Sequence, residues 1–77
     1  MRCFLNTNDL QDAIEKRQHI SHPRFIDVSF VPMSFEADPY TVNICGYWFN
    51  ERYKNPCSIK LDSIDVVDLD VWHITKA

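Results

Sequence analysis

The chain has 77 residues, a formal net charge of −3, one glycine and three cysteines. This length predicts one domain, residues 1–77, with a single small core. The acidic balance argues against general affinity for nucleic acids, which favour clustered basic residues. No run approaches the roughly 18 apolar residues of a membrane span. The polar residues from Asn6 onward and the odd number of cysteines predict a cytoplasmic protein with reduced thiols and no membrane contact.

The first clear element expected is a helix from Asn8 to His19. A strand at Arg2–Leu5 is only thinly indicated before it. The side chains of residues 6–8 supply oxygens suited to an N-cap, and the acidic start and basic end of the segment suit a helix macrodipole. The helix must end before Pro23. One narrow apolar stripe follows the helical period, made of Leu10, Ala13 and Ile14.

Beyond Pro23 the hydrophobic period changes from helical to alternating, which predicts strands. In residues 24–31 one face is apolar, and Pro32 ends this strand or marks an edge. That apolar face consists of Ile26, Val28 and Phe30. Residues 36–39 predict a turn, and alternation resumes at Tyr40.

The most aromatic stretch of the chain follows this turn. Strand parity predicts that one face of the strand beginning at Tyr40 points towards the core. This face is made of Tyr40, Val42, Ile44, Gly46 and Trp48. The other face is made of Thr41, Asn43, Cys45, Tyr47 and Phe49. Residues 50–56 are polar and end in Asn-Pro, which predicts a hairpin loop. A further strand is expected to carry Cys57, Ile59 and Leu61.

The C-terminal segment does not fit one straight strand, because its apolar residues change parity at Val66–Val67. Either a β-bulge lies there, or Ser63–Val66 forms a turn before a strand at Val67–Ile74. We favour the turn, since Asp62-Ser63 is a turn-forming pair. Four residues are then predicted to face away from the core, namely Asp68, Asp70, Trp72 and Ile74.

These elements together predict an α+β fold, in which one N-terminal helix packs on one face of a four- to five-stranded, mostly antiparallel sheet. No motif in the chain indicates a particular chemical reaction. The cysteines and histidines lack the paired spacing of structural zinc sites. Cys45 and His73 form a thiol dyad only if their strands are neighbours, which nothing predicts. We therefore expect no enzyme, no cofactor and no bound metal.

Four aspartates between Asp62 and Asp70 form an acidic segment. The first interpretation is a solvated edge that prevents the strand from pairing with other chains. The alternative is an acidic surface for a basic partner.

Strand parity leaves four large side chains on the sheet face that the helix does not cover: Tyr47, Phe49, Trp72 and Ile74. An apolar patch of this size is unusual on a monomer, and tyrosine and tryptophan are favoured interface anchors. Its polar rim would consist of Arg52, Tyr53, Lys54, Asp68 and Asp70. The alternative is a register error that returns Trp72 to the core.

The sequence therefore predicts a small protein-interaction module, an inhibitor or a regulator, which binds a protein partner or a second copy of itself through the outer face. Compact chains of this size and character are common among phage and mobile-element proteins that block a host enzyme, which is an analogy of size and character only. The second hypothesis is a nucleic-acid or nucleotide-ligand binder that uses the aromatic and basic side chains of residues 47–54. The scattered basic residues make nucleic acid the less favoured partner.

Overall fold

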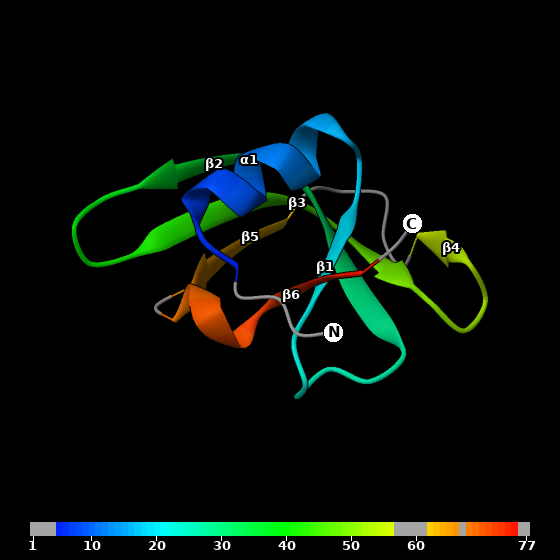
Figure 1. Cartoon of the computed structure of the whole chain (residues 1–77). Coiled ribbons are helices and arrows are strands. Elements are labelled where there is room, and N and C mark those ends of the chain that lie inside the picture. Colours follow the sequence, from blue (N-terminus) through cyan, green and yellow to red (C-terminus); the bar gives the residue numbers. More distant parts are fainter. Residues whose placement is uncertain (1–4, 57–61, 67, 76–77) are drawn as a thin grey trace.

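The computed structural model describes residues 5–56, 62–66 and 68–75, and it shows the α+β fold that the sequence predicts: one α-helix with an antiparallel sheet of six strands (Figure 1). The elements are α1 (Thr7–Glu15), β1 (His19–Ser21), β2 (Val28–Ala37), β3 (Val42–Asn50), β4 (Asn55–Pro56), β5 (Asp62–Val66), the 3-10 helix η1 (Leu69–Val71) and β6 (His73–Thr75).

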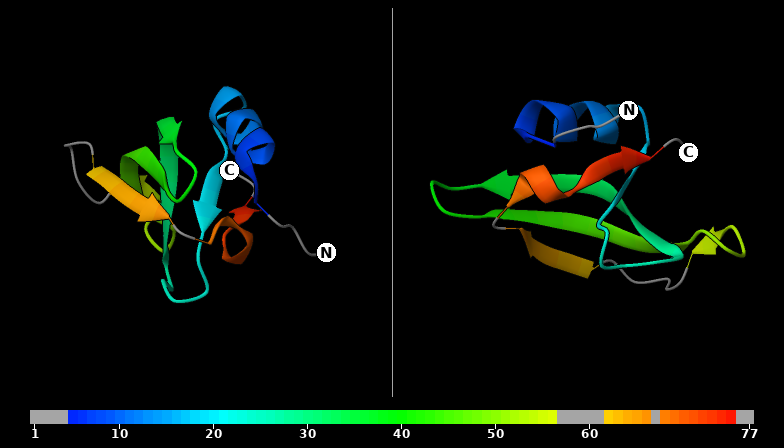
Figure 2. Two further views of the ribbon diagram at one scale, coloured as in Figure 1. Left: turned by 90° about the vertical axis from the view of Figure 1, so that its left-hand side faces the viewer. Right: turned by 60° about the horizontal axis from the view of Figure 1, so that its bottom comes forward.

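The strands are arranged in the order β4-β3-β2-β1-β6, and β5 also pairs with β3. Because β2 occupies one edge of β3, β4 and β5 share its other edge; β4 pairs near Asn50, and β5 pairs from Val42 to Gly46. Figure 2 shows α1 and β5 on opposite sides of the β2–β3 hairpin. No helix in the described part of the chain is long and apolar enough to cross a membrane.

Helix α1 begins as the sequence predicts, because the side chain of Asn6 accepts a hydrogen bond from the backbone N–H of Asp9 (2.9 Å) and caps the helix. The predicted end at His19 is wrong. The helix ends at Glu15 in a Schellman motif, with Arg17 in the left-handed conformation (φ 56°). The chain then turns, so that His19 begins β1, a strand that the sequence analysis missed.

The long β2–β3 hairpin positions most of the core. Burial alternates along β3 as predicted, with Val42, Ile44 and Gly46 buried and Trp48 packed against the core. Strand β2 continues through Pro32, where the register shifts in a bulge, and extends to Ala37. The predicted turn at residues 36–39 therefore lies slightly later, at residues 38–41.

Two residues that the alternation assigned to the core are exposed instead. Ile26 precedes β2 and is 79% exposed, and Tyr40 lies in the turn before β3 and is 85% exposed. Both assignments are wrong because each strand begins two residues later than the apolar pattern suggests.

The core lies between α1, the sheet and the C-terminal segment. Four side chains that lie opposite one another on neighbouring strands form the sheet side of the core: Ile74, Ile20, Phe30 and Trp48. The buried cluster consists of Leu5, Leu10, Ala13, Ile20, Phe30, Val42, Ile44, Val66 and Trp72. Burial of these side chains, each contributing on the order of 1.5–3 kcal/mol for a large apolar group, is the main source of stability.

The structure corrects the C-terminal interpretation. Residues 63–66 belong to strand β5, and a 3-10 turn, η1, lies within the segment predicted to be a strand at Val67–Ile74. This turn changes the direction in which the following side chains point. Trp72 is therefore buried (7% exposed), and Ile74 lies opposite Ile20 on the core side. The prediction that Trp72 and Ile74 face outward is wrong. The strands expected at Arg2–Leu5 and through Cys57, Ile59 and Leu61 lie outside the described residues, apart from Leu5, which is buried.

Candidate functional site

The outer face of β3 carries Tyr47 and Phe49, as strand parity predicts. Both side chains are half-buried, and they lie opposite Val31 and Ser29 of β2. The ring of His19 packs edge-on against Phe49, with their centroids 4.7 Å apart. Strand β1 therefore covers part of this outer face, and Phe49 contributes less exposed surface than the sequence analysis expected.

The end of the β3–β4 hairpin is more exposed than the strand itself. The side chain of Asn50 accepts hydrogen bonds from the backbone N–H groups of Arg52 and Tyr53, both at 2.9 Å. Lys54 completes the turn in the left-handed conformation, with φ 58°. Tyr53 is 69% exposed, so that its ring projects into solvent between two basic residues.

A second loop lies against this hairpin. The backbone N–H of Glu51 donates to the carbonyl of Asp27 (2.9 Å), which joins the β1–β2 loop to the hairpin turn. The exposed Ile26 therefore lies at the same end of the molecule as Tyr53, the end that carries β4 in Figure 1. We call these two loops, residues 22–27 and 51–54, the tip surface. Only the second loop was predictable from the sequence, because the contact between the two loops is made by backbone atoms.

A polar cluster that the sequence analysis missed supports the tip surface from beneath. The Nδ1 atom of His19 lies 2.9 Å from Oε2 of Glu51 and 3.1 Å from Oγ of Ser29. The hydroxyl of Ser29 donates to the same carboxylate oxygen, and Lys54 approaches the other oxygen at 3.3 Å. The hydrogen bond from Ser29, reinforced by His19 and Lys54, holds the pKa of Glu51 below its usual value.

The serine, histidine and glutamate are the residue types of a catalytic triad, but they are connected differently. In a triad the serine bonds one imidazole nitrogen and the carboxylate bonds the other. Here Ser29 and Glu51 both meet Nδ1, and Ser29 is buried. The hydroxyl therefore donates to the carboxylate and has no base positioned to activate it as a nucleophile. The cluster fixes His19 and the hairpin and does not form a nucleophilic relay.

The predicted acidic rim does not lie beside Tyr47 and Phe49, although Asp68 borders the first loop of the tip surface. Asp68 lines a hollow beside Phe25 and Trp72, and the Phe25 ring contacts Trp48, which faces away from Tyr47. Asp68 is therefore on the opposite side of the sheet from Tyr47. Asp70 is exposed on η1. The structure does not bring this predicted acidic rim together with the outer-face aromatics.

The thiol and metal alternatives receive no support from the arrangement of the strands. Cys45 lies on β3 and His73 begins β6, and β2 and β1 separate those two strands. Within residues 5–56, 62–66 and 68–75, no group of three or more histidine, cysteine or acidic side chains is placed to hold a metal ion. Comparison of the chain with protein-family models, with curated proteins and with solved structures finds no match.

Proposed function

We propose that this chain is a non-catalytic protein-interaction module, an inhibitor or regulator, that binds its partner through the tip surface and the adjoining Phe49. The observation that supports this proposal most directly is the backbone hydrogen bond between Glu51 and Asp27, which holds two exposed apolar side chains at one end of the fold. Tyrosine is a preferred interface anchor, because it offers a large rigid area at a small entropic cost.

The charges around the tip surface indicate the chemistry of the partner. Arg24, Arg52 and Lys54 are exposed there, as is Asp27, whereas the carboxylate of Glu51 is already engaged by Ser29, His19 and Lys54. Arg24 shares a hollow with Asp65 and Asp68, so the positive charge of the tip surface lies mainly on the hairpin loop, at Arg52 and Lys54. Positive charge at a rim increases the rate of association with a partner of opposite sign. We therefore expect a protein with an apolar cavity for the tyrosine ring and an acidic border.

The rest of the proposal follows from the sequence. The odd number of cysteines, which predicts reduced thiols, fits a cytoplasmic protein. Self-association through the same surface is the competing form of the proposal, and in a symmetric dimer the two tip surfaces would pack against each other. A solution mass measurement distinguishes a second copy from a different partner.

The experiment compares two exposed tyrosines at opposite ends of the molecule. Tyr53 lies in the tip surface, and Tyr40 lies in the turn between β2 and β3, at the far end in Figure 1. Tagged wild type, Tyr53→Ala, Ile26→Asp and Tyr40→Ala are used to capture proteins from a lysate of the source cells. We expect one protein that Tyr40→Ala and the wild type retain and that the two tip variants lose. The purified pair is then measured for stoichiometry and affinity.

Two outcomes contradict the proposal. If both tip variants bind the captured protein as tightly as the wild type does, the interface lies elsewhere. If Tyr40→Ala loses it equally, the opposite end of the fold is involved. Circular dichroism of each variant checks that the fold is kept, since all three substituted side chains are exposed and none is expected to unfold the chain.

Single-stranded nucleic acid is a second candidate, favoured by the exposed Tyr53 between Arg52 and Lys54. The ion pair of Lys54 with Glu51 reduces the positive charge of this site. Binding of a labelled oligonucleotide that weakens steeply between about 50 and 200 mM salt would support it, because phosphate contacts release counterions. The absence of binding at low salt would remove this candidate.

A further inference from the structure

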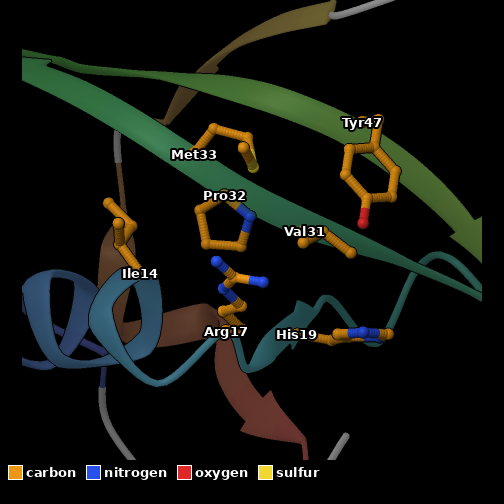
Figure 3. A pocket seen from close by; sticks show the side chains of 7 residues that line it. All are labelled: Ile14, Arg17, His19, Val31, Pro32, Met33 and Tyr47. Carbon is orange, nitrogen blue, oxygen red and sulfur yellow. The ribbon is translucent and has the colours of Figure 1, made fainter. Parts of the chain in front are cut away.

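A pocket separate from the tip surface lies between the end of α1 and the outer side of the β2–β3 pair (Figure 3). Its volume is about 400 Å³, within the usual range for small-molecule sites. Its lining consists of Ile14, Arg17, His19, Val31, Pro32, Met33 and Tyr47. Neither the proposed function nor the polar cluster accounts for this combination of residues.

The floor of the pocket is apolar and rigid. Val31 and Pro32 are buried in β2, and Ile14 adds an aliphatic wall from α1. Met33 is exposed at the margin, where its flexible thioether can adapt to a ligand. The body of a ligand that fits this floor is therefore apolar.

Three polar groups surround the floor. Figure 3 shows the Arg17 guanidinium extending from the end of α1 towards Pro32, and the Tyr47 hydroxyl extending from β3 towards Val31, with the His19 ring at the margin. Within the described residues, no side chain forms a hydrogen bond or an ion pair with that guanidinium or that hydroxyl. Guanidinium and hydroxyl groups donate hydrogen bonds, and a guanidinium suits planar or tetrahedral anions.

The third polar group is held in place by the cluster described above. Nδ1 of His19 donates to the Glu51 carboxylate, so that Nε2 accepts a hydrogen bond in the neutral ring and can donate one to an anion only in the protonated ring. Glu51 is the one carboxylate found in contact with this ring among the described residues. Its two oxygens are already engaged by Ser29, His19 and Lys54, which reduces its repulsion of an anion.

The backbone at Arg17 gives an independent indication. This residue takes the left-handed position of the Schellman motif, where glycine is usual and another L-residue costs about 1–2 kcal/mol. Strain of this kind is often found at binding sites. A positive charge after a helix also interacts favourably with the macrodipole, so a stability measurement must accompany any test of this side chain.

We propose that this pocket binds a small organic anion, with its carboxylate or phosphate head held by Arg17 and Tyr47 and its apolar body on Val31 and Pro32. Carboxylate and phosphate share the chemistry that these donors recognise. The site does not depend on the tip surface, so either proposal can fail while the other stands.

The experiment titrates the full chain with three probes of similar size and follows amide NMR shifts. Benzoate carries a carboxylate head, phenyl phosphate carries a phosphate head, and benzyl alcohol is uncharged. We expect saturable shifts around the pocket with at least one anion, and binding at least about tenfold weaker with the alcohol, the loss expected for a charge-assisted contact. The stronger of the two anions identifies the preferred head group.

Matched variants locate the binding. Arg17→Gln removes the guanidinium, whereas Lys16→Gln removes the same charge from an adjacent exposed residue that does not line the pocket. We expect Arg17→Gln to weaken anion binding about tenfold or more, Tyr47→Phe to weaken it several-fold, and Lys16→Gln to leave it within about twofold. Arg17→Gly gives a second test without left-handed strain and should lose binding while remaining folded.

Several results would overturn the proposal. The proposal fails if neither anion shifts the pocket amides at about 10 mM, which is ten times a millimolar dissociation constant. Equal binding of benzyl alcohol would mean that the pocket recognises the apolar body alone. Equal losses in Lys16→Gln and Arg17→Gln would mean that general charge attraction, and not the pocket, binds the anion. Tyr53→Ala should keep anion binding, which separates this test from that of the tip surface.

Discussion

Replacing Gly46 by alanine should be among the most destabilising single-methyl additions in this protein. Gly46 is buried on β3 opposite Pro32 of β2, and it is the only glycine in the chain. A Cβ at this position would lie 2.0 Å from the carbonyl oxygen of Val31 and 2.9 Å from Cε2 of Phe30. Ordinary carbon–oxygen contacts begin near about 3.3 Å, so the two strands would have to separate by more than about 1 Å.

A separation of this size breaks hydrogen bonds between the strands, because N–H···O distances seldom exceed about 3.2 Å. Two lost bonds at about 1 kcal/mol each, together with about 1–3 kcal/mol for repacking around Phe30, give a loss of about 3–5 kcal/mol. A domain of this length has about 4–12 kcal/mol in total.

Urea unfolding followed by circular dichroism measures this loss. With a slope of about 1 kcal/mol per molar urea, the midpoint should fall by about 3–5 M, or the variant should be unfolded in water. The control is Cys45→Ala, which trims a half-exposed neighbour on the same strand and should change the free energy of unfolding by less than about 1 kcal/mol. A loss below about 0.5 kcal/mol for Gly46→Ala would refute the close approach of β2 and β3.

Three further substitutions test the helix start, the polar cluster and the core. Asn6→Ala should cost about 1 kcal/mol by removing the N-cap, whereas Asn8→Ala, at an exposed helical site, should cost less; equal thermal shifts would contradict the cap. Glu51→Gln should cost about 1–3 kcal/mol at pH 7. Because hydrogen bonding from Ser29 lowers the folded pKa of Glu51, its contribution is complete above the unfolded value of about 4.3 and is lost as pH falls through the folded value. The difference from wild type in urea unfolding should therefore shrink below about pH 4, and a pH-independent difference would contradict the cluster. Trp72→Asp should unfold the protein, because it buries a charge in place of an aromatic ring, and the near-UV circular dichroism of the packed core should then be lost. A variant that stays folded would show that Trp72 lies outside the core.

The parts of the fold that were predictable depend on local rules. Strand parity from Val42 to Phe49 follows from a period of two, and the side-chain cap at Asn6 follows from the orphan N–H groups of a helix start. The division of Tyr47 and Phe49 from Trp48 was correct for the same reason. These features need no information about distant residues.

The features of the fold that the sequence did not predict depend on tertiary contacts, or on a residue in a backbone conformation that its side chain disfavours. The end of α1 escaped prediction because an arginine, and not a glycine, takes the left-handed position. The single turn η1 interrupts the alternation that a strand would show, which reversed the predicted direction of Trp72. The cluster of His19, Ser29 and Glu51 joins three separate segments, and no spacing in the sequence indicates that they meet.

The positions of backbone strain connect the two proposed surfaces. Among the residues that the structure describes, three other than glycine have positive φ angles: Arg17 at the pocket, and Asp27 and Lys54 in the two loops of the tip surface. Aspartate tolerates this conformation, but arginine and lysine do not favour it, and glycine would adopt it without a steric cost. The one described glycine, Gly46, is needed instead where two strands approach closely, and its φ is not positive. Glycine would relieve the backbone strain at residues 17 and 54. The side chain of Lys54 has a contact within the fold, its ion pair with Glu51. Among the described residues no side chain pairs with the guanidinium of Arg17, and the anion proposed for the pocket would supply that contact.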